Sequence, residues 1–151
     1  MEWLRALHGT IVGLDTAPLI YFIEKHPIYL PLLLPFFEAV ESGDIQVVTS
    51  TLTLTEVLVH PYRDRNPDLA ERYFQILLHA RHLRTVALSP AIAAEAARVR
   101  ADFQMKTPDA IQLATAKESG ATSFVTNDGE LASIPGLRVI VLEQVRRGSQ
   151  V

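Results

Sequence analysis

The sequence contains no cysteine. Disulfide bonds and thiolate metal sites are therefore excluded, and any metal ion would have to be held by carboxylates, histidines or carbonyl groups. Long hydrophobic runs are also absent, because the longest, residues 28–37, is too short to span a bilayer and carries two prolines. The first ten residues lack the charged, apolar and small-residue order of a signal peptide. We therefore expect a soluble, cytoplasmic protein with no membrane partner.

Low-complexity segments, linkers and internal repeats are also missing. The chain has 151 residues, of which 48% are hydrophobic and 21% are charged. This size and composition suit a single compact domain over residues 1–151 with a sizeable core.

Short apolar runs rich in Val and Ile alternate with helical patterns along the chain. Continuous runs of this kind are typical of strands that are buried on both faces. Helices between consecutive strands call for parallel pairing with right-handed crossovers, so the pattern predicts an α/β fold. The predicted strands are residues 11–14, 45–49, 84–88, 123–126 and 138–142.

Three helix starts are marked by a capping side chain followed by proline. These are Asn66-Pro67, Ser89-Pro90 and Thr107-Pro108, where we expect the polar residue to be the N-cap. The last of these helices should stop near Gly120. Residues 27–41 are helical in pattern but carry Pro31 and Pro35, so this helix should be kinked or start late.

Four carboxylates are predicted to reach one edge of the sheet. Asp15 follows the first strand, Glu56 comes after the second, Asp109 lies in the first turn of a helix, and Asp128 follows the fourth strand. In open α/β sheets the carboxyl ends of the strands are where ligands bind.

Each acid also has a purely structural interpretation. Asp15 could be an N-cap, and Glu56 could complete a capping box with Thr53. Asp109 could interact with the helix dipole, and Asp128 in Asn-Asp-Gly could be a turn residue. Taken singly, Glu56 and Asp128 favour the structural interpretation, and the sequence leaves Asp15 and Asp109 open. A functional interpretation is favoured only because all four acids are predicted to lie at the same edge of the sheet.

Converging carboxylates repel one another, and a divalent cation would remove that repulsion. Mg²⁺ and Mn²⁺ prefer oxygen ligands, and such a site suits phosphodiester hydrolysis. The net charge of −3 argues against a nucleic-acid partner only if the acids are spread evenly. Arginines around residues 63–72 could contact RNA phosphates, although single charges are more often solvated. The five histidines show no metal-ligand spacing.

Four short motifs resemble the PIN-domain family, in particular the VapC-like ribonuclease toxins of type II toxin–antitoxin pairs. They are Leu14-Asp15-Thr16, Thr55-Glu56-Val57-Leu58, residues 108–116 (PDAIQLATA) and residues 125–128 (VTND). The resemblance covers nearly the whole chain. One departure is Ala17, where many relatives carry a small polar residue.

The resemblance implies a three-layer α/β/α fold around a five-stranded parallel sheet. It implies an endoribonuclease that depends on Mg²⁺ or Mn²⁺ and acts on RNA, with Asp15, Glu56, Asp109 and Asp128 as metal-binding and catalytic residues. Thr16 and Thr126 would support the acids or a metal-bound water. A homodimer and a protein antitoxin are the implied partners.

Two other classes compete with the nuclease hypothesis. The same fold could serve as an RNA- or protein-binding module with weak or no catalysis. A phosphoacceptor receiver domain or a haloacid-dehalogenase-type phosphatase would also have an acidic pocket. The receiver needs a lysine after the last strand, where Glu143 stands, and the phosphatase needs a second acid at Ala17. The sequence therefore supports the receiver or phosphatase class least.

Overall fold

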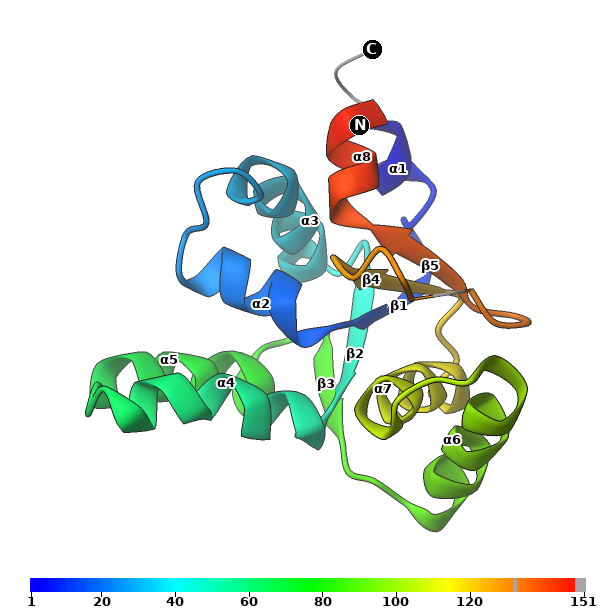
Figure 1. The fold of residues 1–151 in the computed structure, drawn as a ribbon. Coiled ribbons are helices and arrows are strands. Elements are labelled where there is room, and N and C mark those ends of the chain that lie inside the picture. Colours follow the sequence, from blue (N-terminus) through cyan, green and yellow to red (C-terminus); the bar gives the residue numbers. More distant parts are fainter. Residues whose placement is uncertain (132, 149–151) are drawn as a thin grey trace.

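A five-stranded parallel sheet forms the centre of the protein (Figure 1). The computed structural model describes residues 1–131 and 133–148. The strand order is β3-β2-β1-β4-β5, with every neighbouring pair parallel. The strands are β1 (Ile11–Leu14), β2 (Gln46–Ser50), β3 (Leu83–Val86), β4 (Ser123–Thr126) and β5 (Arg138–Val141). The predicted five-stranded parallel sheet is confirmed, and three of the strands have boundaries displaced by one or two residues.

Helices connect the strands and cover both faces of the sheet. They are α1 (Glu2–Arg5), α2 (Thr16–Ile23), α3 (Leu30–Ser42), α4 (Thr51–Arg63), α5 (Pro67–His79), α6 (Pro90–Phe103), α7 (Thr107–Glu118) and α8 (Leu142–Gly148). Figure 1 shows α6 and α7 on one side of the sheet and α2, α3 and α5 on the other. The α/β/α layering expected from the sequence is therefore present.

Alternation along the central strand divides the core into two clusters. Val12 and Leu14 of β1 belong to the cluster that packs with α2, α3 and α5. Gly13 between them faces α7, where a Cβ atom would stand only 2.5 Å from the Cβ of Ala116. Gly13 therefore allows α7 to lie directly against β1, and α7 carries Asp109.

The helix starts largely follow their predicted caps. The amide of Leu69 donates to Asn66 and the amide of Ile92 donates to Ser89 at 3.1 and 3.2 Å. The prediction for Thr107 is wrong: Lys106 is the N-cap of α7, it makes no side-chain cap hydrogen bond, and Thr107 is the first helical residue. Pro108 therefore stands at the second helical position rather than the first, and the proline marks the helix start only to within one position.

The helix α3, which contains Pro31 and Pro35, starts late, and this is one of the two outcomes predicted for it. It begins at Leu30, which places Pro31 in the first turn, where a missing amide donor costs little. Pro35 lies inside the helix. No helix within the described residues combines the length and apolar character needed to cross a membrane.

Candidate functional site

Asp15 lies at the carboxyl end of β1 and is held through both oxygens of its carboxylate. Oδ1 accepts from the amide of Thr16 at 2.8 Å, so Asp15 is the N-cap of α2. Oδ2 accepts from the hydroxyl of Thr126 at 2.6 Å. The structural interpretation of Asp15 as a cap is thus correct. The hydrogen bond from Thr126, at the end of the neighbouring strand β4, shows that the same carboxylate also belongs to a network of polar side chains.

Thr126 connects Asp15 to Asp128. Its side chain is fully buried at the end of β4. The hydroxyl donates to Asp15 and accepts from the amide of Asp128 at 3.0 Å. Asp128 is exposed, and its Oδ1 accepts from the amide of Glu130 at 3.0 Å, as expected of a turn residue. One buried hydroxyl therefore fixes the spacing between two of the four predicted acids.

Glu56 arrives from the opposite side of Asp15, on the second turn of α4. Its Oε1 accepts from the hydroxyl of Thr16 at 3.0 Å. The proposed capping box with Thr53 is wrong, because α4 begins earlier, at Thr51, and is capped by Ser50. Glu56 is thus a mid-helix residue whose carboxylate is exposed and connected to Asp15 only through Thr16.

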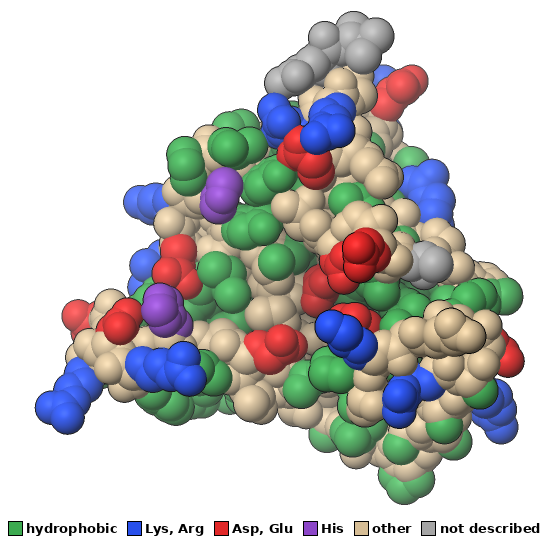
Figure 2. All heavy atoms as spheres, viewed as in Figure 1, with side chains coloured by type: hydrophobic (Ala, Val, Ile, Leu, Met, Phe, Trp, Pro, Cys, Tyr) green, Lys and Arg blue, Asp and Glu red, His purple; other side chains and the backbone are tan. Residues whose placement is uncertain are grey.

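Asp109 is the third residue of α7 and is partly buried. Its pKa is raised, first by burial and then by the negative charges of Asp15 and Asp128, against a smaller lowering by Lys106. The negative charges of Asp15 and Asp128 are therefore close enough to Asp109 to raise its pKa. Figure 2 shows acidic side chains gathered near the centre of this face, with a basic side chain beside them.

A buried chain of hydroxyl groups lies beneath these acids. Thr49 donates to the carbonyl of Leu14 at 2.8 Å, so Thr53 donates to Thr49, also at 2.8 Å. The amide of Gln112 donates to Thr53 at 2.8 Å. Thr53 also lies 3.4 Å from the hydroxyl of Thr16. This network ties α2, α4 and α7 together, and so orients the helices that carry three of the acids.

Sequence reasoning missed this network. Gln112 lies one turn after Asp109 and therefore on the same helix face, which is the one signal that could have indicated it. Its Oε1 atom is buried and has no hydrogen-bond partner among the residues that the structure describes. Thr53 was considered only as a cap.

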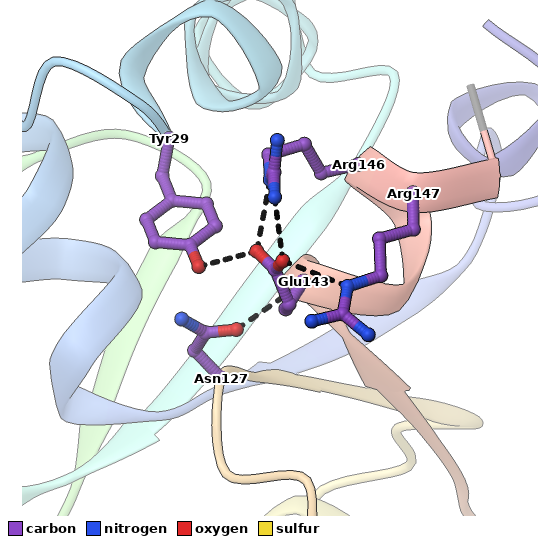
Figure 3. Close-up of polar contacts among 5 residues, drawn as sticks. All are labelled: Tyr29, Asn127, Glu143, Arg146 and Arg147. Carbon is purple, nitrogen blue, oxygen red and sulfur yellow. Dashed lines mark hydrogen bonds and ion pairs between the residues drawn. The ribbon is translucent and has the colours of Figure 1, made fainter. Parts of the chain in front are cut away.

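Glu143 forms a second polar cluster directly after β5 (Figure 3). Its carboxylate accepts from the hydroxyl of Tyr29 at 2.6 Å and pairs with Arg146 and Arg147 at 2.7 and 3.0 Å. Arg146 first, and then Tyr29, hold the pKa of Glu143 well below its usual range. Asn127, the neighbour of Asp128, accepts from the amide of Glu143 at 2.9 Å. This cluster anchors α8 beside the loop that carries Asp128.

The arginines proposed to contact RNA are not equally available. Arg72 donates to the carbonyl of Ile23 at 2.9 Å and so connects α5 to the end of α2. Arg63 and Arg65 are exposed at the turn between α4 and α5. The RNA contact therefore stays a prediction for Arg63 and Arg65, whereas Arg72 already has a structural partner.

The donor set of the site suits a hard divalent cation. Asp15, Asp109 and Asp128 present carboxylate oxygens, and the raised pKa of Asp109 records the repulsion that a cation would relieve. No three acidic or histidine side chains within residues 1–131 and 133–148 are arranged to surround one ion. Mg²⁺ does not require such a cage, because it keeps several waters and is commonly bound through one or two carboxylates.

Comparisons with known proteins agree with this architecture. The family model described as PIN domain matches residues 12–137. A chain of a toxin–antitoxin complex from Klebsiella pneumoniae is 24% identical, with a TM-score of 0.65 over 89% of this chain and 98% of that one. A chain of VapBC2 from Rickettsia felis, bound to a promoter DNA fragment, is 20% identical, with a TM-score of 0.66 over 87% and 98%.

A chain of DNA-bound VapBC from Salmonella typhimurium is 21% identical, with a TM-score of 0.60 over 88% of this chain and 98% of that one. At these identities the likeness establishes a shared fold. No curated protein sequence matches the chain.

Proposed function

The chain belongs to the PIN domain family, and from this membership we propose that it is a metal-dependent endoribonuclease and the toxin of a toxin–antitoxin pair. The observation that carries the proposal is the position of three acids: Asp15 follows β1, Asp128 follows β4, and Asp109 in the first turn of α7 lies near enough to both for their charges to add to the effect of burial in raising its pKa. Three carboxylates from separate segments share one edge of the sheet, where ligands bind in folds of this class. The toxin assignment is supported by fold likeness to chains of toxin–antitoxin complexes.

In this proposal Asp15, Asp109 and Asp128 hold Mg²⁺ or Mn²⁺. The bound metal would orient the RNA phosphate, favour ionisation of water and stabilise the leaving oxygen. Thr126 keeps Asp15 and Asp128 at a constant spacing through its two hydrogen bonds. Side-chain rotations would have to bring the three carboxylates around the ion, because no three acidic side chains among the described residues already surround one position.

Glu56 has a different role from the three aspartates. The hydroxyl of Thr16 holds one of its oxygens, which leaves the other free to orient or accept a proton from the attacking water. Because the carboxylate is exposed, Glu56 can also reach the metal through a water. Thr16 and Thr126 are thus positioning residues in this proposal.

The decisive experiment is cleavage of a mixed RNA pool by purified protein, with Mn²⁺ and with a chelator. Asp15→Asn removes a metal ligand while keeping the shape of the side chain. Asp44→Asn is the matched control, because Asp44 is exposed just before β2 and therefore lies at the opposite edge of the sheet. We expect metal-dependent cutting by the wild type and by Asp44→Asn, and none by Asp15→Asn.

Equal cutting by all three proteins that persists with the chelator would indicate a contaminating nuclease, whereas equal cutting that requires Mn²⁺ would contradict the site assignment. Absence of cutting, together with no Mn²⁺ binding by calorimetry, would favour the binding-module alternative. The proposed homodimer and antitoxin are tested separately. Sedimentation would reveal the dimer, and co-purification with the product of an adjacent gene would reveal the antitoxin. We place the protein in the cytoplasm, where RNA substrates are found.

A further inference from the structure

A pocket of about 200 Å³ opens beside Asp109 and Asp128, and the proposed chemistry does not use it. Besides these two carboxylates, its lining includes the apolar side chains of Phe103, Met105 and Leu131. Pockets for drug-sized ligands span about 300–1,000 Å³, so this space suits something smaller. A pocket of mixed polar and apolar lining that borders the acidic site is available to a group attached to the substrate.

Hydrogen bonds to main-chain carbonyls fix two of the segments that line the pocket. Phe103 is the last residue of α6 and remains 38% exposed, because Gln104 turns the chain away in a left-handed conformation (φ 52°). Arg100 donates to the carbonyl of Met105 at 2.9 Å. The amide of Leu131 donates to the carbonyl of Asp128 at 3.2 Å. These contacts preform the pocket, so a ligand need not order it.

Lys106 provides a positive charge at the mouth of the same pocket. It is exposed and close enough to Asp109 for its charge to act on that carboxylate. Within the part of the chain that the structure describes, Lys106 forms no ion pair at 4.0 Å or less. A cation that lies beside the acids without pairing to them is available for a phosphate oxygen.

Two polar side chains complete the lining, Gln104 and Glu130. A side-chain amide can pair with the edge of adenine, and a carboxylate accepts from the exocyclic amino groups of cytosine, adenine and guanine. Uracil carries no amino group, and its one ring N–H donor lies between two carbonyl oxygens that would repel the Glu130 carboxylate. Both side chains are exposed, so water can satisfy them and the resulting preference against uracil should be modest.

We propose that this pocket is a subsite for the nucleotide next to the scissile phosphate. The base stacks on Phe103, Lys106 binds the adjoining phosphate, and Gln104 and Glu130 favour a base that carries an exocyclic amino group over uracil. The inference rests on the proposed ribonuclease function and adds a determinant of where the RNA is cut.

The first test is sequencing of the cut ends from a randomised RNA digested by the wild-type protein. We expect one position beside the cut to be depleted in uracil relative to the three bases that carry an exocyclic amino group. Glu130→Ala combined with Gln104→Ala should flatten the preference at that position and leave the other positions unchanged. If the doubly substituted protein keeps the wild-type preference, the assignment of the pocket is wrong.

The second test is binding, which does not depend on cleavage. Labelled oligo(A), oligo(C) and oligo(U) are titrated into Asp15→Asn protein and followed by fluorescence anisotropy. Phe103→Ala should weaken binding about tenfold, as loss of one base stack does. Phe103→Trp should restore it and Phe103→Leu should not, because only the aromatic side chain offers a stacking face.

Lys106→Gln should lower the slope of log affinity against log salt concentration by about 0.7, the share of one phosphate contact on a single strand. Lys25→Gln is the matched control, because it removes the same charge at the far end of α2 from Asp15. Equal slopes for the two variants would overturn the phosphate assignment.

These tests separate the two proposals. Metal-dependent cutting by the wild type together with pocket variants that behave like the wild type would refute the subsite alone. Absence of cutting, with normal selective binding that the pocket variants abolish, would refute the nuclease function and leave the base-binding pocket in place.

Discussion

Removal of the Thr126 hydroxyl tests whether the acids must be held at a constant spacing. Thr126→Val keeps the side-chain shape but loses the donor to Asp15 and the acceptor for the amide of Asp128. A hydrogen bond to a charged group contributes about 1.5–3 kcal/mol, and an unsatisfied buried amide costs about 1–3 kcal/mol. Because Asp15 is only partly buried, the lower values apply, and the free energy of unfolding should fall by roughly 2–3 kcal/mol.

For a domain of this size the corresponding fall in Tm is roughly 4–12 °C, measured by calorimetry in the presence of a chelator. The larger consequence should be functional. Loss of a residue that orients metal ligands typically weakens metal affinity or activity by about 10–100-fold. Titration of RNA cleavage with Mn²⁺ should therefore show a weaker apparent metal affinity, although all four carboxylates remain.

Thr126→Ser is the control, because it keeps the hydroxyl and loses only a methyl group. It should retain most of the wild-type metal affinity. If Thr126→Val cleaves RNA with the metal dependence of the wild type, the acids do not need this positioning and the argument fails. If Thr126→Ser is as impaired as Thr126→Val, packing of the methyl group matters rather than the hydrogen bonds.

Three further perturbations follow from the structure. The raised pKa of Asp109 means that the folded, metal-free state binds this proton more tightly than the unfolded chain, so stability falls as pH rises above about 3.8 and through the folded pKa. The side chain introduced by Asp109→Asn has no proton to lose in this range, so the free energy of unfolding of this variant relative to the wild type should grow over that pH interval, as measured by urea titrations with a chelator. A difference that does not change with pH would contradict this prediction. Gly13→Ala should cost roughly 1–3 kcal/mol, since the new methyl group would lie 2.5 Å from Ala116 and force α7 off the sheet; an unchanged Tm would refute this contact. Tyr73→Phe should lower stability by about 1–2 kcal/mol, because the fully buried ring loses its hydroxyl bond to the Glu24 carboxylate; equal unfolding midpoints would show that this bond contributes nothing.

Local features of the sequence predicted the architecture well. The strands end within two residues of their predicted positions because continuous Val- and Ile-rich runs are bounded by polar residues. Asn66 and Ser89 cap their helices because capping depends only on residues a few positions away. Where the local signal was ambiguous, at Thr107 and in the supposed capping box of Thr53, the prediction was wrong.

The sequence by itself determined the five strands and three of the helix starts to within two residues, and the position of each acid along the chain, but it indicated neither α1 nor α8. Only the tertiary structure decided how these acids are connected. Thr126 reaches Asp15 across 111 positions of sequence, and Gln112 reaches Thr53 across 59. Such contacts depend on strand order, on strand register and on the close approach of α7 to β1 at Gly13. No periodic pattern in the chain encodes these features, because they arise only when separate elements pack together.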